Sequence, residues 1–303
     1  MREQTLFLSV DAEHTLAVYA QGNPQGLPII YLHGGPGAAC DLKNFDIFDL
    51  TRCFVIFHDQ RGCGGSTPFG LLENNTIWHL ISDIEKIRHH FNLDKILLYG
   101  GSWGSALALA YAQTYPHQVL GLVLRSICLV SEREYVWSYQ FGANQLFPEA
   151  WAKFMAFVPE GRENIVHYYY ECLISEDPKT VAAATLAWQN WAAACLQLPQ
   201  LAELPEAQKD YLINISRIET HYFSQGAFLC TANQLIDDLP RIAHLKMAIV
   251  HGAKDYLCPL ANAYLLHQAC PHSTLTVVPE AGHLGSAPGM REALQQAVFQ
   301  FME

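Results

Sequence analysis

The 303-residue sequence lacks any apolar run long enough to span a bilayer. It also lacks an apolar signal segment after Met1-Arg2-Glu3-Gln4. These two absences argue against a transmembrane protein and against export, so we expect a cytoplasmic protein. Internal repeats and low-complexity tracts are missing as well, which argues against a repeat protein.

No Cys-x-x-Cys pair occurs among the nine cysteines, and their odd number and scattered positions favour free, mostly buried thiols. Blocks of lysine and arginine are also missing, and the formal net charge is −11. Binding to nucleic acid or to an anionic membrane surface is therefore not expected. A small or cationic substrate is easier to accommodate, although many cytosolic proteins are simply acidic.

Half of the residues are apolar, enough for one large α/β domain with an insertion or for two ordinary domains. Short apolar runs alternate with helical periodicity, which predicts a parallel sheet with right-handed crossovers. The expected strands are an antiparallel pair, 5–10 and 15–19, and then 27–32, 54–57, 95–99, 119–124, 247–250 and 273–278. The expected helices are 76–91 with Asn75 as its cap, one that begins near Ala106, 259–269 and 291–302.

The character of the sequence changes between about residues 126 and 239, where strand-like runs vanish and aromatic residues recur at helical spacing. We interpret residues 126–239 as a helical cap domain inserted into an α/β catalytic domain of residues 1–125 and 240–303. Most of the cap aromatics are expected to pack between cap helices. They are Trp137, Tyr139, Phe147, Trp151, Phe154, Tyr168, Trp188 and Trp191.

The stretch Gly100-Gly101-Ser102-Trp103-Gly104 lies between a predicted strand and a predicted helix. Strand, tight turn and helix in this order are the setting of a nucleophile elbow, whose strained apex would be Ser102. Gly100 and Gly104 allow the strand and the helix to approach closely. The helix N-terminus offers free N–H groups to a developing negative charge. The alternative is an ordinary Gly/Ser turn, which the flanking elements disfavour.

A serine hydroxyl becomes a nucleophile when an imidazole removes its proton, and the imidazole needs a carboxylate that fixes its tautomer. In α/β-hydrolases the chain order is Ser, then Asp or Glu, then His. Asp255 and His283 follow the last two predicted strands in that order. We therefore predict that Ser102, Asp255 and His283 are catalytic. The weaker candidates are His251, which we assign to a supporting role, and Asp237 and Asp238 at the cap exit.

A second glycine-rich turn, His33-Gly34-Gly35-Pro36-Gly37, follows strand 27–32. The backbone N–H of Gly35 and that of Trp103 are predicted to form an oxyanion hole. Because the carboxyl ends of parallel strands meet at one edge of a sheet, residues that follow separate strands should share this rim. Those residues are His33, Asp59, Ser102 and Arg125.

Several motifs occur along the chain: 33–37 (HGGPG), 59–64 (DQRGCG), 100–105 (GGSWGS), 108–111 (ALAY), 251–252 with Asp255, 258–259 (CP) and 282–283 (GH). Taken together, they resemble the proline iminopeptidase family of serine peptidases over nearly the whole chain, the cap included. The first two in combination are far more specific than Gly-x-Ser-x-Gly. The resemblance implies an α/β-hydrolase fold with a helical cap. It also implies removal of an N-terminal residue, preferably proline, from peptides without a metal or cofactor.

The resemblance further implies how the substrate's ammonium is held. The family uses two cap glutamates, because hydrogen bonds to a buried charge contribute roughly 1.5–3 kcal/mol each. Glu219, in the segment 217–223, matches one of them. The other should follow the segment 188–191 (WQNW), but that residue is Ala192. Arg125 matches an arginine that the family places near these acids.

The pocket for the proline ring also departs from the family pattern. Phe223 keeps an aromatic ring, whereas Cys128 and Ser138 stand where the family tends to have aromatics. These three residues join Glu219, Arg125 and Ala192 as the substrate-binding residues that the resemblance implies. With a single glutamate, Arg125 leaves less negative potential for an ammonium, which favours a carboxylate-bearing or neutral substrate.

The sequence leaves three functional hypotheses. The leading one is a serine aminopeptidase of the proline iminopeptidase type that acts on small peptides through an acyl-enzyme on Ser102. The second is a hydrolase of an ester, an amide or an N-blocked substrate, motivated by Ala192, Cys128 and Ser138. The third is a non-catalytic binding protein on a hydrolase scaffold, which would have no need of the complete catalytic set.

Overall fold

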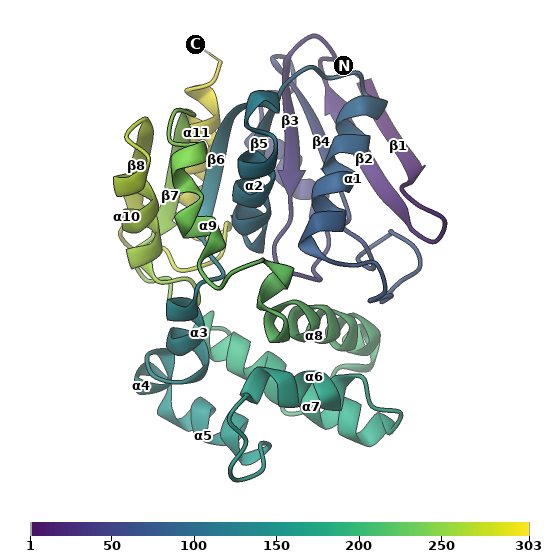
Figure 1. The fold of residues 1–303 in the computed structure, drawn as a ribbon, viewed down its shortest axis with the longest axis vertical. Coiled ribbons are helices and arrows are strands. Elements are labelled where there is room, and N and C mark those ends of the chain that lie inside the picture. The colour runs from purple at the N-terminus through teal and green to yellow at the C-terminus, as the bar shows by residue number, and fades with distance from the viewer. Residues whose placement is uncertain (1, 303) are drawn as a thin grey trace.

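Eight strands form a single sheet in the order β1-β2-β4-β3-β5-β6-β7-β8 in the computed structural model, which describes residues 2–302 (Figure 1). β1 pairs with β2 and β2 with β4 in antiparallel fashion, and all other pairs are parallel. The strands are β1 (Arg2–Ser9), β2 (Thr15–Gly22), β3 (Leu27–Leu32), β4 (Cys53–His58), β5 (Ile96–Ser102), β6 (Val119–Ile127), β7 (Met247–Gly252) and β8 (Ser273–Val278). The inner strands β4, β5 and β7 are buried throughout, because helices cover both faces of a parallel sheet.

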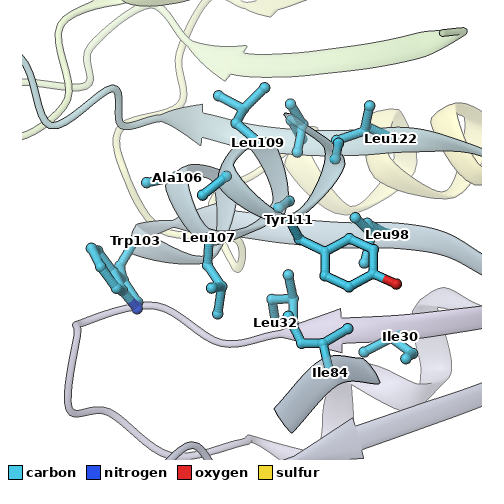
Figure 2. Close-up of a cluster of buried hydrophobic side chains, with 14 of the residues drawn as sticks. Ile30, Leu32, Ile84, Leu98, Trp103, Ala106, Leu107, Leu109, Tyr111 and Leu122 are labelled. Carbon is cyan, nitrogen blue, oxygen red and sulfur yellow. The ribbon is translucent and has the colours of Figure 1, made fainter. Parts of the chain in front are cut away.

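Helices α1 (Ile77–His90), α2 (Trp103–Thr114) and α10 (Leu260–Ala269) pack on one face of the sheet, and α11 (Met290–Phe299) packs on the other with η1 (Leu42–Ile47). Figure 2 shows the first face, where Leu107 and Tyr111 of α2 lie among side chains of β3, β5 and α1. Nearly every residue of α2 is buried, and each buried leucine contributes roughly 1.5–3 kcal/mol. The core therefore fixes the helix that follows Ser102.

Between β6 and β7 the chain builds a layer of helices beside the carboxyl ends of the parallel strands (Figure 1). Aromatic rings pack against one another there as expected, for example Phe154 on Tyr169 with ring centroids 4.5 Å apart. The helices of this cap are α3 (Glu132–Tyr139), α4 (Ala143–Leu146), α5 (Pro148–Ala156), α6 (Ile165–Leu173), α7 (Pro178–Cys195) and α8 (Lys209–Ser224). The remaining short helices are η2 (Pro116–Gln118), η3 (Glu206–Gln208), η4 (Gly226–Phe228), α9 (Gln234–Asp237) and η5 (Leu239–Arg241).

Asn75 does not cap α1, contrary to the prediction. The helix begins at Ile77 after Thr76, and the side-chain amide of Asn75 donates to the backbone oxygens of Arg61 (3.0 Å) and Leu71 (3.2 Å). Its side chain is therefore engaged by the loop after β4. The nine cysteines are free thiols, seven of them buried. Among the described helices, none combines the length and the apolar character that a membrane crossing requires.

Candidate active site

Ser102 stands at the junction of β5 and α2 with φ 58° and ψ −127°, a backbone conformation that is strained for a residue with a side chain. Two glycines make this turn possible. A Cβ on Gly100 would lie 2.2 Å from the backbone oxygen of Gly104, and a Cβ on Gly104 would lie 2.1 Å from that of Leu32. The packing of β3, β5 and α2 thus leaves no space for a larger residue at either position.

Ser102, His283 and Asp255 form a continuous hydrogen-bonded chain. The Ser102 hydroxyl lies 3.0 Å from His283 Nε2. On the other side of the ring, His283 Nδ1 lies 2.9 Å and 3.0 Å from the two carboxylate oxygens of Asp255. Since a carboxylate only accepts, Nδ1 carries the proton and Nε2 is free to accept the serine proton.

The loop after β7 holds Asp255 rigidly. Its Oδ1 accepts the backbone N–H groups of Leu257 (3.1 Å) and Cys258 (2.8 Å). Burial opposes the charged form, but the charge and hydrogen bond of His283, helped by His251 and Cys258, hold the pKa of Asp255 below its usual value. His251 accepts the Ile127 N–H and donates to the Cys258 carbonyl, consistent with the supporting role expected for it.

The glycine-rich turn after β3 lies against the elbow. A Cβ on Gly34 would be 3.4 Å from that of Ser102, and Gly35 has φ +115°, which strongly favours glycine. Gly35, Ser102 and Trp103 line the same cavity. Gln60 joins the two turns, because its amide donates to the His33 carbonyl (3.0 Å) and accepts from Trp103 Nε1 (3.0 Å).

Asp59 follows the end of β4, and its side chain binds the surrounding loops. Its carboxylate accepts the backbone N–H groups of Cys40 (2.7 Å) and Gly65 (2.9 Å) and the Tyr19 hydroxyl (3.2 Å). All of its described partners are therefore donors of the surrounding loops and of β2.

Arg125 does not line the substrate cavity, contrary to the prediction. Its guanidinium donates to the carbonyl of His283 and to the Ser126 hydroxyl. A Cβ on Gly101 would lie 2.6 Å from this guanidinium, so the Arg125 side chain packs directly against β5. It therefore holds the loop that carries His283, and the structure does not bring it to the cap acids.

Above Ser102 lies a cavity of about 460 Å³ between the sheet edge and the cap. Its wall is mostly apolar and aromatic, and it contains the Glu219 carboxylate of α8, which accepts a hydrogen bond from Trp188 Nε1 at 2.7 Å. Burial raises the pKa of Glu219 to about 7, although the Trp188 hydrogen bond opposes this shift. The cavity thus combines apolar walls with a carboxylate whose charge changes near neutral pH.

Five of the six residues expected to bind substrate line this cavity: Cys128, Ser138, Ala192, Glu219 and Phe223. Trp188 and Tyr139 also line the cavity, although their spacing predicted only packing between cap helices. Glu134 is a further cavity residue that was not predicted, although Ser131-x-x-Glu134 has the pattern of a capping box, which the structure contains. Within the described residues, one group has the geometry to hold a metal ion, namely Cys128, Glu134 and Cys258.

Known proteins match this chain over most of its length. The family model described as "alpha/beta hydrolase fold" matches residues 28–288. A proline iminopeptidase from Xylella fastidiosa strain 9a5c is 42% identical over 298 residues, covering 97% of this chain and 95% of that protein. One from Arabidopsis thaliana is 40% identical and covers 95% of this chain and 77% of that protein. The chain belongs to the proline iminopeptidase family of α/β-hydrolases. This confirms the resemblance, the fold class and the serine hydrolase assignment.

Solved structures agree with the family on the fold. An esterase from Exiguobacterium antarcticum superposes with a TM-score of 0.61 at 22% identity, covering 99% of this chain and 99% of that chain. A thermophilic esterase from Thermogutta terrifontis gives a TM-score of 0.59 at 20% identity, covering 100% of this chain and 98% of that chain. At such low identity these structures support the α/β-hydrolase fold alone.

Proposed function

We propose that this protein is a serine aminopeptidase that releases the N-terminal residue, preferably proline, from small peptides. One observation carries the proposal: Ser102, which is hydrogen-bonded to His283 and through it to Asp255, lines a cavity that also contains the carboxylate of Glu219. An aminopeptidase needs a nucleophile and a group that recognises a free amine, and this cavity offers both. The curated relatives described above carry the same activity in their names.

The reaction follows from the geometry. Ser102 Oγ attacks the carbonyl carbon of the N-terminal residue while His283 Nε2 accepts the hydroxyl proton across 3.0 Å. The backbone N–H groups of Gly35 and Trp103 stabilise the oxyanion, and each such donor is worth on the order of 10²–10³ in rate. His283 then protonates the leaving amine, and the acyl-enzyme on Ser102 is hydrolysed by water with His283 as the base. Asp255 holds His283 in the required tautomer throughout.

Glu219 supplies recognition of the N-terminus. An ionised carboxylate in a mostly apolar wall attracts a primary or secondary ammonium group more strongly than it would in water. Trp188 fixes the carboxylate through one oxygen at 2.7 Å. We assign the other oxygen, Oε1, to the substrate's amine.

Hydrolysis of proline 4-nitroanilide by the purified protein tests the proposal, with Ser102→Ala as the control. We expect Ser102-dependent release of nitroaniline, and Glu219→Gln should lower kcat/KM for this substrate by about tenfold or more, since a hydrogen bond to a charge contributes roughly 1.5–3 kcal/mol. If kcat/KM is unchanged in Glu219→Gln, the carboxylate does not bind the amine.

Ala192 motivates a second candidate function. It lines the cavity, and its methyl side chain offers no polar group that could bind an amine together with Glu219. Because the pKa of Glu219 is about 7 and position 192 offers no second carboxylate beside it, the cavity also suits an ester, an amide or an N-blocked amino acid. Comparing kcat/KM for proline 4-nitroanilide and N-acetylproline 4-nitroanilide separates the two functions. Preference for the free amine supports the aminopeptidase, and preference for the acetylated compound supports this second candidate.

A non-catalytic binding protein would not react at Ser102. Labelling with a fluorophosphonate probe, which forms a covalent bond with an activated serine, distinguishes it from both enzymes. We expect stoichiometric labelling of the wild type and none of Ser102→Ala.

A further inference from the structure

Two cysteines and a glutamate meet in the wall of the substrate cavity. The sulfur atoms of Cys128 and Cys258 and a carboxylate oxygen of Glu134 all lie within 4.8 Å of one another. Cys128 follows β6, Glu134 lies in α3 and Cys258 lies in the loop after β7, so separate parts of the chain converge here. Both cysteines are largely buried, with exposed fractions of 9% and 5%, yet all three residues line the cavity.

This set of atoms matches the ligand preference of a thiophilic divalent cation. Thiolate sulfur and carboxylate oxygen are both ligands of Zn²⁺, which is commonly tetrahedral and keeps an open position when only three protein ligands bind it. Two soft sulfur ligands disfavour Mg²⁺ and Ca²⁺, which prefer oxygen donors. The cavity side of the cluster leaves room for water as the fourth ligand.

The carboxylate of Glu134 is already oriented for such a role. The Leu129 N–H is shared between its two oxygens, at 2.9 Å from Oε2 and 3.1 Å from Oε1. Oε2 also accepts the Ser131 N–H at 3.0 Å. Oε1 accepts a hydrogen bond from the side-chain amide of Asn262 at 2.8 Å, in addition to the shared Leu129 N–H at 3.1 Å. The Ser131 hydroxyl also donates to Oε2 at 3.1 Å. All of these donors are neutral and fix the carboxylate, and Oε1, with one full and one shared hydrogen bond, is the less heavily engaged oxygen.

The cluster is also joined to the catalytic residues. The Cys258 N–H donates to Asp255 at 2.8 Å. The Cys128 N–H donates to the Ser105 hydroxyl at 3.0 Å, which in turn donates to the Ser102 carbonyl at 2.7 Å. A cation held by the two sulfurs would therefore lie beside the cavity floor and would restrict the space that a substrate occupies above Ser102.

We propose that Cys128, Cys258 and Glu134 form a site for a thiophilic divalent cation of the Zn²⁺ type, and that its occupation inhibits hydrolysis. The two thiols release their protons to solvent as the metal–sulfur bonds form, and no electron is transferred. The metal takes no part in the serine reaction. The inhibition arises because the bound cation occupies the wall of the substrate cavity.

Titration of the reduced, metal-free protein with Co²⁺ tests the site directly, because cobalt bound to thiolate shows sulfur-to-metal charge-transfer absorption. We expect one equivalent of Co²⁺ to produce this absorption together with the visible bands of tetrahedral cobalt, and Zn²⁺ to displace it. Cys128→Ser and Cys258→Ser should each weaken Co²⁺ binding by at least roughly tenfold and reduce the charge-transfer absorption. Glu134→Gln should weaken binding while the sulfur absorption persists at saturation.

Three controls keep the result specific. Cys230 is an exposed free thiol elsewhere in the chain, so Cys230→Ser should retain the full cobalt spectrum. His283→Ala should also retain it, which separates this site from metal bound to the catalytic imidazole. Far-UV circular dichroism of each variant confirms that it is folded.

Inhibition provides the second measurement. Zn²⁺ should inhibit hydrolysis of the substrate that the wild type turns over, and a chelator should reverse the effect. The double variant Cys128→Ser/Cys258→Ser should lose at least tenfold in sensitivity to Zn²⁺ in whatever activity it retains. The proposal is overturned if the wild type shows no charge-transfer absorption with Co²⁺, or if the double variant shows as much as the wild type. These spectra do not depend on which substrate the enzyme uses, so failure of the proposed function leaves this test intact.

Discussion

At the scale of single residues, the site depends on side chains and backbone groups that hold the reacting residues without themselves reacting. Asp255 holds the Nδ1 side of His283, and backbone N–H groups of Leu257 and Cys258 hold Asp255. Arg125 holds the carbonyl of His283. The imidazole therefore has one orientation, with Nε2 directed at Ser102, before any substrate enters.

Asp255→Asn tests the tautomer that this arrangement imposes. An asparagine oxygen can still accept from Leu257 and Cys258, but its NH₂ group would face His283 Nδ1 and favour the proton on Nε2. Nε2 could then no longer accept the Ser102 proton, and we expect kcat to fall by about 10⁴. Steady-state kinetics measures the fall, and a kcat within tenfold of the wild type would contradict the assigned role.

Glu219 predicts a specific dependence on pH. Its pKa is about 7, so it is neutral below that pH and ionised above it, and only the ionised form attracts a cationic amine. The ratio of kcat/KM for proline 4-nitroanilide to that for its N-acetyl analogue should rise through pH 7 and fall about tenfold for each unit below it. His283 acts as the base in both reactions, so its contribution cancels in the ratio. Glu219→Gln should give a ratio that is flat across this range.

The sequence predicted Ser102, Asp255 and His283 because each follows a strand and their order matches that of the fold. It could not place Arg125, because its position at a strand end does not reveal which face of the sheet its side chain takes. Trp188 was assigned to packing, and it does pack in the cap core, yet its indole N–H also reaches Glu219. Spacing along a helix does not distinguish these two roles.

At the scale of elements, the tight turn between β5 and α2 requires close contact between the backbones of β3, β5 and α2. Gly104→Ala would place a Cβ 2.1 Å from the Leu32 oxygen, so we expect a loss of about 3 kcal/mol in the free energy of unfolding. Urea denaturation measures this loss. Fluorophosphonate labelling should slow as well, because the displaced strand and helix carry Ser102.

Gly161→Ala is the control for that change. A Cβ at Gly161 has open space around it but meets a positive φ of +82°, so the expected loss is about 1 kcal/mol with labelling unchanged. Equal losses in the two variants would show that the contact between a Cβ at position 104 and the Leu32 oxygen is relieved at little cost, and that crowding does not make Gly104 necessary.

Most elements were predictable because the sheet is buried on both faces and its strands are nearly continuous apolar runs. Strands 27–32 and 273–278 have the predicted bounds. β6 instead continues to Ile127, beyond the predicted end at residue 124. Polar Arg125 and Ser126 made the run appear to stop there, whereas pairing of β6 with β5 extends to Ile127. The start of α1 was predicted to within one residue, but its cap was not, because Asn75 has tertiary partners that local sequence does not show.

At the scale of the whole molecule, α8 joins the cap to the catalytic part and carries Glu219 above Ser102. Its Asn214 amide donates to the Gly62 carbonyl at 2.8 Å, and the Tyr222 hydroxyl donates to the Asn75 side chain at 2.8 Å. The ring of Tyr222 also packs edge-on against Trp103, with centroids 4.8 Å apart. The position of the Glu219 carboxylate is thus fixed by contacts to the loops that surround the elbow.

Tyr222→Phe tests this connection because it removes one hydroxyl and keeps the ring against Trp103. The buried Asn75 oxygen would lose its donor, and we expect the free energy of unfolding to fall by about 1–3 kcal/mol. Because α8 would be held less firmly, the position of Glu219 should be less well defined and KM for a free-amine substrate should rise several-fold. Fluorophosphonate labelling of Ser102 should stay at the wild-type rate. Tyr264→Phe, at an exposed position on α10, should change neither quantity. Slower labelling together with an unchanged KM would mean that Tyr222 acts on the elbow through Trp103 and that the cap is positioned by its other contacts.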